Sequence, residues 1–294
     1  MLTALLVLQL AATAPATDPF EFFRPSVTID AGERRRLDAG EAIARTLPAP
    51  DSEVAILAVV RVNIDGDRLV AWMRRVEELK KSSYVPGIGR FSNPPRLEDL
   101  AGLSLDDEDL SEIRSCRPGR CGLKLSPDEI ASLQRAAAAA KDGWQDAVQQ
   151  AFRCAMLTRA QAYLATVRIH PDTESFLYWS KERLSRKAIV SITHVTITRG
   201  ESPGMPEVLV AGKGIYATHY LDASLGQTAL VRGEAGSPGY LVYINRSEVD
   251  VLQGMFGGII RWFMERQLKS EASGVLLGLR RRLESGEPGA DHGT

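Results

Sequence analysis

Residues 188–245 decide the predicted fold, and they read AIVSITHVTITRGESPGMPEVLVAGKGIYATHYLDASLGQTALVRGEAGSPGYLVYIN. The segment contains five runs that are rich in β-branched residues and predict strands, at 188–198, 207–211, 214–221, 227–232 and 239–245. Turns rich in Gly or Ser separate the runs, notably at 200–204 and 233–239. Because these links are too short for crossover helices, the segment predicts an antiparallel meander.

The segment that follows predicts a long amphipathic helix over residues 247–283. Apolar residues recur there at helical spacing from Val249 to Leu283. Ser247 is suited to cap this helix, and Gly286 ends it. Residues 287–294 are then expected to form a disordered tail.

The segments that precede the meander alternate between strand and helix patterns. Residues 53–64 read EVAILAVVRVNI and predict a buried strand, and residues 68–81 predict an amphipathic helix. Residues 97–113 carry many acids and predict solvated turns or short helices. A capping box that starts at Ser126 predicts a helical segment at about 126–167, which Gly143 bends or breaks.

Two shorter patterns lie at residues 37–47 and 176–182. A short helical pattern covers residues 37–47 within an expected N-terminal arm, residues 17–50. Phe176, Tyr178 and Trp179 precede the charged pair Lys181 and Glu182, and this order favours a helix start packed on the sheet over a ligand lid.

The order of elements predicts an α+β fold, in which an antiparallel curved sheet grips a long C-terminal helix and the helical segment 126–167 is extra. This order resembles the START-like helix-grip superfamily, which includes lipid-transfer domains and polyketide-cyclase-like proteins. The nearest local likeness is YLVYINRSEVDVLQGMFGGIIRWFMERQ, residues 240–267, which looks like the last strand and gripping helix of bacterial members. The resemblance implies a START-like domain over residues 51–286, with an apolar cavity between sheet and helix.

A second resemblance is to a family of uncharacterised secreted bacterial proteins. It is carried by the segments FLYWSKE, ITHV, YATHYLDASLG and VYINRSEVD. This likeness brings no activity, substrate or cofactor with it.

Composition excludes several function classes. The 294 residues hold 36 Lys and Arg against 37 Asp and Glu, which gives a net charge of −1 and no global reason to expect nucleic acid as a partner. Three cysteines are too few for a four-cysteine metal site. The sequence contains no P-loop, dinucleotide turn or HExxH motif, so we predict neither a cofactor nor a metal.

The first residues predict export. Residues 1–16 read MLTALLVLQLAATAPA, a short apolar run followed by small residues, as in a signal peptide. The alternative is a buried first helix or strand. Export places the mature chain in the periplasm or outside the cell.

An oxidising compartment favours a disulfide between Cys116 and Cys121, which flank a Pro-Gly turn. Two free thiols are the main alternative, and the CxxxxC spacing makes redox or metal work the poorer one. Cys154 lies in the predicted helical segment and is expected to be a free, buried core residue.

The candidate ligand-binding residues on the predicted strands are His194, Tyr216, His219 and Tyr220. Each histidine has apolar neighbours on its expected strand face, which favours a structural role over acid–base chemistry or metal binding. Tyr216 and Tyr220 lie on the opposite face of their strand and suit either packing or a cavity with polar anchors. Arg246, after the last strand, is suited to pair with an acid or with a ligand head group.

The remaining candidates are Gly254, Gly257 and Gly258 in the predicted C-terminal helix. Three glycines within five positions weaken a helix, so they indicate either close helix–sheet contact or access to a cavity.

The leading hypothesis is an exported, non-enzymatic binding protein for a lipid-like or other apolar small molecule. An enzyme of cyclase or hydrolase type that uses His194 or His219 is the first alternative, and an envelope structural or interaction protein is the second. The arginine runs 34–36 and 280–282 are expected to be solvated, and they also allow contact with a membrane surface. No oligomeric state is predicted.

Overall fold

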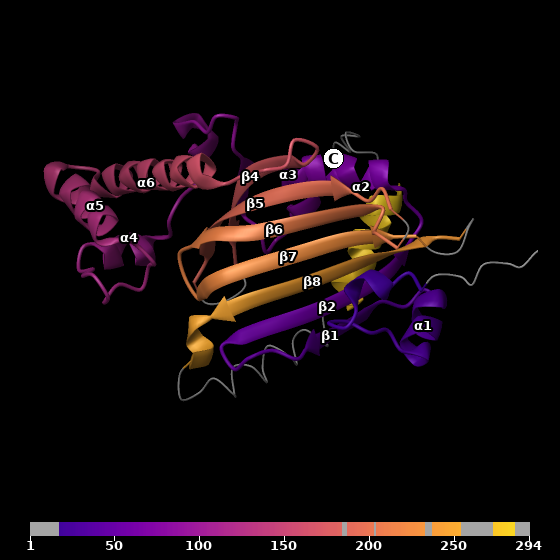
Figure 1. The fold of residues 1–294 in the computed structure, drawn as a ribbon. Coiled ribbons are helices and arrows are strands. Elements are labelled where there is room, and N and C mark those ends of the chain that lie inside the picture. Colours follow the sequence, from indigo (N-terminus) through magenta and orange to yellow (C-terminus); the bar gives the residue numbers. More distant parts are fainter. Residues whose placement is uncertain (1–17, 184–186, 203, 233–236, 254–272, 286–294) are drawn as a thin grey trace, which may run out of the picture.

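The computed structural model describes residues 18–183, 187–202, 204–232, 237–253 and 273–285 (Figure 1). Its centre is a single antiparallel sheet of eight strands in the order β1-β2-β8-β7-β6-β5-β4-β3. The strands are β1 Ile43–Leu47, β2 Glu53–Val62, β3 Gly87–Arg90, β4 Glu174–Glu182, β5 Ile189–Arg199, β6 Val208–Ala217, β7 Leu221–Val231 and β8 Gly239–Val249. The predicted α+β class and the antiparallel meander are therefore confirmed.

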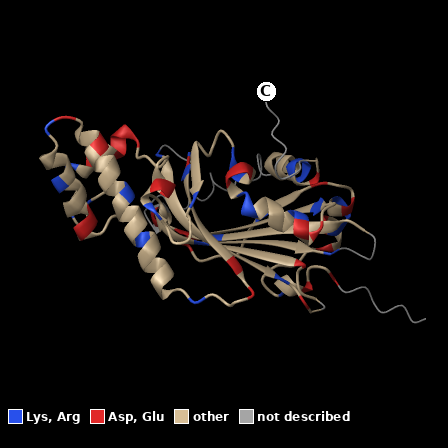
Figure 2. Cartoon of the chain, turned by 90° about the horizontal axis from the view of Figure 1, so that it is seen from above, with Lys and Arg blue, Asp and Glu red and all other residues tan. Residues whose placement is uncertain are grey.

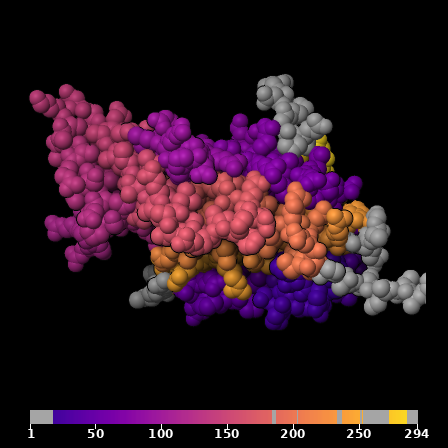
Figure 3. Space-filling model, turned by 45° about the horizontal axis from the view of Figure 1, so that its top comes forward, coloured from indigo at the N-terminus to yellow at the C-terminus, as the bar shows by residue number. Residues whose placement is uncertain are grey.

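Helices lie on both sides of this sheet. The α-helices are α1 Ala31–Asp38, α2 Gly66–Arg74, α3 Val76–Lys80, α4 Asp107–Ile113, α5 Pro127–Ala139, α6 Trp144–Thr166 and a C-terminal helix at 273–285. Short 3₁₀ turns are η1 Glu21–Phe23, η2 Leu97–Leu100 and η3 Asp250–Gln253. Figure 3 shows α4, α5 and α6 projecting from one end of the body. Within the described ranges, no helix combines the length and the apolar composition that crossing a bilayer requires.

We call the side of the sheet that packs against α2, α3 and the C-terminal helix the inner face. The strand residues in this core include Val60, Val195, Val210, Leu230 and Leu241. The other side, the outer face, is covered in two places. The N-terminal segment with α1 packs on β1, β2, β7 and β8, and α4 to α6 pack on β4, β5 and β6. In Figure 2, the view from above, basic and acidic residues are interspersed along the helices.

Local sequence explains where several helices begin. Asp65 caps α2 by accepting a hydrogen bond from the Arg68 backbone N–H at 2.8 Å. Ser126 and Glu129 form the predicted capping box of α5. Gly143 adopts a φ of +68°, which separates α5 from α6 as predicted and which side-chain-bearing residues rarely adopt.

Hydrogen bonds hold the C-terminal helix against α2, α3 and the loop that follows β2. Glu284 accepts a hydrogen bond from the Asn63 backbone N–H at 2.8 Å. Arg282 donates to the Leu79 carbonyl at the end of α3, at 2.7 Å. Arg68 donates to the Glu284 carbonyl at 3.0 Å. These contacts fix residues 273–285 over the sheet.

Several boundaries differ from the prediction. Residues 176–182 belong to strand β4 and do not start a helix. The sequence pattern was misleading because side chains on both faces of β4 are buried, so the segment lacks the polar–apolar alternation that predicts a strand. The helix pattern at 37–47 is also wrong, since α1 ends at Asp38 and β1 begins at Ile43. The predicted strands 207–211 and 214–221 form a single strand that ends at Ala217.

The predicted helix start at Ser247 is wrong as well. Ser247 pairs with Val54 and Ser224 inside β8, so it caps no helix. The chain is helical at 273–285, whereas residues 254–272 lie outside the described residues. The expected signal peptide and the expected disordered tail also lie outside them. What the structure shows of the helix-grip prediction is a curved antiparallel sheet with helices over it.

Candidate ligand-binding cavity

Strand register brings two glycines together near the middle of the inner face. Gly212 of β6 is the direct partner of Gly226 of β7, which in turn pairs with Asn245 of β8. A Cβ at Gly212 would have Thr193 Cγ2 as its nearest neighbour at 3.5 Å, and a Cβ at Gly226 would have Asn245 Nδ2 at 3.6 Å. Both distances are ordinary contacts, so packing within the described protein does not require glycine here. Glycine weakens a strand, and it often marks a bulge, a bend or the close approach of another group.

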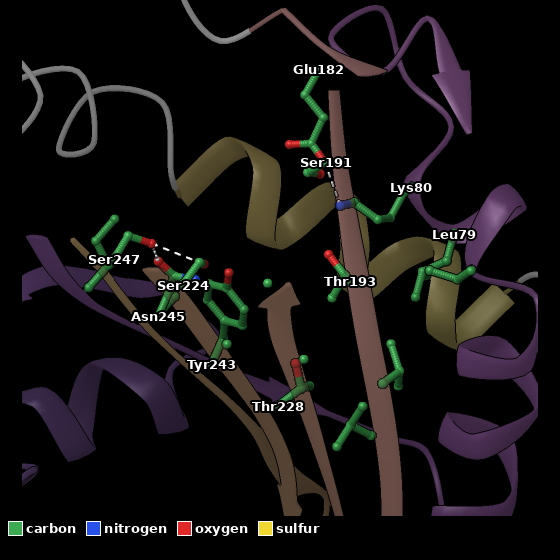
Figure 4. Close-up of a pocket in the computed structure, with 18 of the residues that line it drawn as sticks. Leu79, Lys80, Glu182, Ser191, Thr193, Ser224, Thr228, Tyr243, Asn245 and Ser247 are labelled. Carbon is green, nitrogen blue, oxygen red and sulfur yellow. Dashed lines mark hydrogen bonds and ion pairs between the residues drawn. The ribbon is translucent and has the colours of Figure 1, made fainter. Parts of the chain in front are cut away.

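A cavity of about 1090 Å³ lies over this glycine floor (Figure 4). The helices α2 and α3 and the C-terminal helix form the roof of the cavity. The apolar side chains of this roof are Leu69, Met73, Val76, Leu79, Val275, Leu276, Leu279 and Leu283. Small-molecule pockets in proteins usually enclose about 300–1,000 Å³. The space is therefore large enough for a lipid-sized molecule.

The sheet forms the floor of the cavity, and this floor is more polar than the roof formed by the helices. Its hydroxyl and amide groups are Ser191, Thr193, Ser224, Thr228, Tyr243, Asn245 and Ser247. Ser247 Oγ donates to Asn245 Oδ1 at 2.8 Å and forms a second hydrogen bond with the Ser224 hydroxyl at 3.1 Å. Among the described residues, the hydroxyls of Thr193 and Thr228 have no hydrogen-bond partner, and Figure 4 shows both on the strands that line the cavity. The cavity thus has an apolar roof and a floor that can form hydrogen bonds.

Tyr243 is central to this floor. The residue is 37% exposed although β8 lies inside the sheet, because its side chain faces the cavity. The phenol group itself lies between the cavity walls, and this desolvation raises its pKa above the ordinary value of 10.0, while a hydrogen bond with Asn245 opposes the rise. Tyr243 therefore keeps its proton at neutral pH and presents a neutral O–H group to the cavity.

A paired charge lies at the edge of the floor, where α3 and β4 end. Lys80 Nζ donates to Glu182 Oε1 at 2.6 Å and to the Tyr178 hydroxyl at 3.2 Å. Burial alone would lower the pKa of Lys80, but Tyr178 and Glu182 outweigh burial and raise it. Burial alone would raise the pKa of Glu182, but Lys80 outweighs burial and lowers it. Both groups are thus charged at neutral pH, and together they carry no net charge.

His194 lies on β5 and points away from the cavity. It is buried beneath α6, where its Nδ1 lies 3.0 Å from the Tyr163 hydroxyl. Its Nε2 has no hydrogen-bond partner among the described residues. Burial lowers its pKa, and Lys213 adds to this effect. The imidazole is therefore neutral at pH 7.

His219 is not on a strand, because β6 ends at Ala217 and β7 begins at Leu221. Its Nδ1 lies 2.8 Å from the Gly122 carbonyl, and its Nε2 lies 3.1 Å from the Asp109 carboxylate. Burial would lower its pKa, but Asp109 outweighs burial and raises it. The pairing fits the predicted structural role. Its partner, Asp109, was not predicted, because it lies in an acid-rich segment that sequence reasoning assigned to solvent.

The other predicted candidates are separated from one another. Tyr216 borders the cavity, but its ring packs in the outer-face core, with the Arg159 guanidinium 4.6 Å from the ring centre. Tyr220 has a φ of +62° in the turn before β7 and packs on the small cluster of Val54, Val249 and Leu252. Arg246 pairs with Glu53 at 2.6 Å, as one of its two expected roles required.

Gly254, Gly257 and Gly258 lie outside the described residues. The glycines that do line the cavity, Gly212, Gly214 and Gly226, are on the sheet. The alternation of Gly212 and Gly214 within one strand pattern was the signal that could have found them, since both fall on the same face.

The structure joins Cys116 and Cys121 as a disulfide, and the turn between them places Gly119 at a φ of +74°. The Glu112 carboxylate lies near both sulfurs. Cys154 is free as predicted, but it is exposed and not buried, because it lies on the solvent side of α6. The expectation of a buried thiol is therefore wrong.

Comparison of the chain with protein-family models, with curated proteins and with solved structures gave no match.

Proposed function

We propose that the protein is an exported, non-enzymatic binding protein that holds a lipid-like or other apolar small molecule in the inner-face cavity. The observation that carries this proposal is the Gly212–Gly226 pair beneath the roof of apolar helix side chains. Protein interiors are normally close-packed, so a cavity of about 1090 Å³ over a glycine floor needs a reason. Occupancy by a ligand supplies one.

The positions of the histidines favour binding over the cyclase or hydrolase alternative. Neither His194 nor His219 is among the residues that line the cavity. His194 contacts Tyr163 and His219 contacts Asp109, so the two histidines share no partner. A general base must lie within hydrogen-bond reach of the substrate proton that it removes, and these two side chains face the outer core.

The hollow interface likewise favours binding over a purely structural role. A structural or interaction protein would be stabilised by a filled interface between sheet and helices, because each empty volume sacrifices packing energy. Retention of the cavity is easier to explain by a ligand that occupies it. We further propose that the sheet and the C-terminal helix correspond to a helix-grip arrangement of the START-like kind.

The direct test fills the cavity from its floor. Gly226→Leu places a large apolar side chain over Gly212, and Gln227→Leu is the matched control because the next residue on β7 faces the other side of the sheet. Binding of Nile red, an uncharged apolar dye, is measured by fluorescence for wild type and both variants. We expect Gly226→Leu to weaken binding at least about tenfold, which corresponds to about 1.4 kcal/mol, and Gln227→Leu to leave it unchanged.

Circular dichroism melts accompany the titration, so that loss of folding is separated from loss of binding. Native mass spectrometry of the protein from periplasmic material then asks whether a small molecule co-purifies. The proposal fails if wild type binds no dye and carries no molecule. It also fails if folded Gly226→Leu binds as tightly as wild type.

A further inference from the structure

Resting on the proposed function, we propose that the ligand is an uncharged amphiphile whose polar part carries hydroxyl groups, such as a long-chain alcohol or a monoacylglycerol. The chemistry of the floor favours such a ligand. Thr193 and Thr228 present hydroxyls that no described residue satisfies, and Tyr243 presents a neutral O–H group beside them. A hydroxyl can donate and accept, so these three groups match a ligand that also carries hydroxyls.

The arrangement of these groups supports a localised polar part. Thr228 pairs directly with Tyr243 across β7 and β8, and Thr193 lies across the glycine pair on β5. Figure 4 shows Tyr243 and Thr228 on one side of the cavity and Thr193 on the other. A polar head placed over Gly212 and Gly226 is therefore surrounded by hydroxyls, while an acyl chain lies against the leucines of the roof.

The balance of charge argues against an anionic head. Lys80 already donates to Glu182 at 2.6 Å, so a ligand carboxylate at this place must compete with Glu182. A ligand that took Lys80 would leave the Glu182 carboxylate without its counter-ion, which is a costly outcome for a partly buried group. An uncharged head leaves the ion pair intact.

The other charged groups of the lining do not alter this conclusion. Asp222 pairs with Lys124, and Arg282 donates to the carbonyls of Glu78 and Leu79. Lys81 is exposed to solvent, where a charge is screened by water and salt. The charged lining groups are thus either engaged by the protein or hydrated.

The test compares ligands that share a chain length of about twelve carbons and differ in the head group. Monolauroylglycerol, dodecanol and laurate compete with Nile red at pH 7.5, below their micellar concentrations, with wild-type protein. We expect the two uncharged ligands to displace the dye at concentrations at least about tenfold lower than laurate does. Equal or tighter binding of laurate overturns the inference and leaves the proposed function standing, whereas no binding of any probe overturns both.

Variants then locate the head group. The double variant Thr193→Val/Thr228→Val removes both floor hydroxyls and keeps the shape of the side chains. Thr198→Val is the matched control, because Thr198 is an exposed residue near the end of β5. We expect the double variant to bind monolauroylglycerol about tenfold more weakly and laurate almost unchanged, and the control to match wild type. Unchanged monolauroylglycerol affinity in the folded double variant places the head elsewhere and contradicts the inference.

Discussion

The two faces of the sheet are covered by helices in different ways, and β6 shows the contrast within one strand. On the outer face, Tyr216 and its neighbour Ile192 pack with Phe152 and Met156 of α6 in a dense core. On the inner face, the same strand presents Gly212 and Gly214 to a cavity. Simple alternation would place residues 212, 214 and 216 on one face, but the register shift opposite Ile192 and Thr193 inserts an extra residue in β6 and turns Tyr216 to the outer face. A single strand thus builds a packed wall and a hollow one.

This difference separates stability from binding. Phe152, Met156 and Ile192 are each 0% exposed, and complete burial of such side chains is the main source of folding free energy. Over the glycine floor, by contrast, Met73 and Leu79 are only partly buried, since the cavity lies in front of them. Changes on the outer face should therefore alter stability, and changes on the inner face should alter ligand affinity.

The largest expected effect is a loss of stability, and it is measured by truncating one side chain on each face of the sheet. Phe152→Ala should lower the free energy of unfolding by about 3–5 kcal/mol, because it opens a cavity in a close-packed core. Met73→Ala should cost well under half as much, since part of the Met73 side chain already faces open space. Urea denaturation followed by circular dichroism measures both. Equal losses for the two variants would show that the inner face is as tightly packed as the outer one.

The next effect concerns the buried ion pair that joins α4 to the β6–β7 turn. His219→Gln removes one of the two cations beside the Asp109 carboxylate, since Lys187 Nζ remains 3.4 Å away, and should cost about 2–3 kcal/mol at pH 6. The pKa of His219 is raised above 6.5 in the folded state, so its stabilisation is complete below pH 6.5 and is lost as the pH rises through the folded pKa. The stability difference between wild type and variant should therefore shrink from pH 6 to pH 8.5.

His194 supplies a control of opposite sign. Burial lowers its pKa below 6.5, so the stability that neutral His194 contributes is present above pH 6.5 and is lost as the pH falls through the folded pKa. The difference between wild type and His194→Gln should then shrink toward low pH. Parallel pH profiles for the two variants would contradict the assigned protonation states.

Much of the architecture could be predicted because it depends on local patterns. The capping box at Ser126, the break at Gly143 and the apolar strand from Glu53 each arise within a few residues. The segment 174–182 was harder, since both faces of β4 are covered and an apolar run without alternation does not distinguish a strand from a helix. Serine is a residue type that often caps helices, but pairing with Val54 of β2 places Ser247 inside a strand.

The side-chain pairs and the cavity were less predictable, because both depend on contacts between residues that are distant in the sequence. Asp109 and His219 are 110 positions apart, and no spacing rule connects them. A cavity between sheet and helices could be expected from the resemblance of the fold, but its floor depends on register, which places Gly212 opposite Gly226. Register follows from the pairing of whole strands and cannot be read from one strand alone.

A smaller effect is expected at the disulfide beside the packed face. Replacing both Cys116 and Cys121 by Ala should lower the free energy of unfolding by about 2 kcal/mol, because the cross-link closes only a short loop. Dye binding in the inner-face cavity should not change. Denaturation with and without dithiothreitol provides the control, since the reductant should destabilise wild type and leave the double variant unaffected. A loss of dye affinity would show that the two faces are coupled.

The smallest effect is expected at Cys154, on the same helix that fills the outer core. Phe152, Met156 and Ala160 recur every four residues and form the buried stripe of α6. Cys154 lies two residues from both Phe152 and Met156, which is about 200° around the helix axis, so its thiol points to solvent. Cys154→Ser should therefore change the free energy of unfolding by less than about 0.5 kcal/mol. In the native wild-type protein the thiol should react with Ellman's reagent at the rate of an exposed cysteine, whereas a thiol that reacts only after denaturation would mean that α6 packs on the sheet through a different stripe.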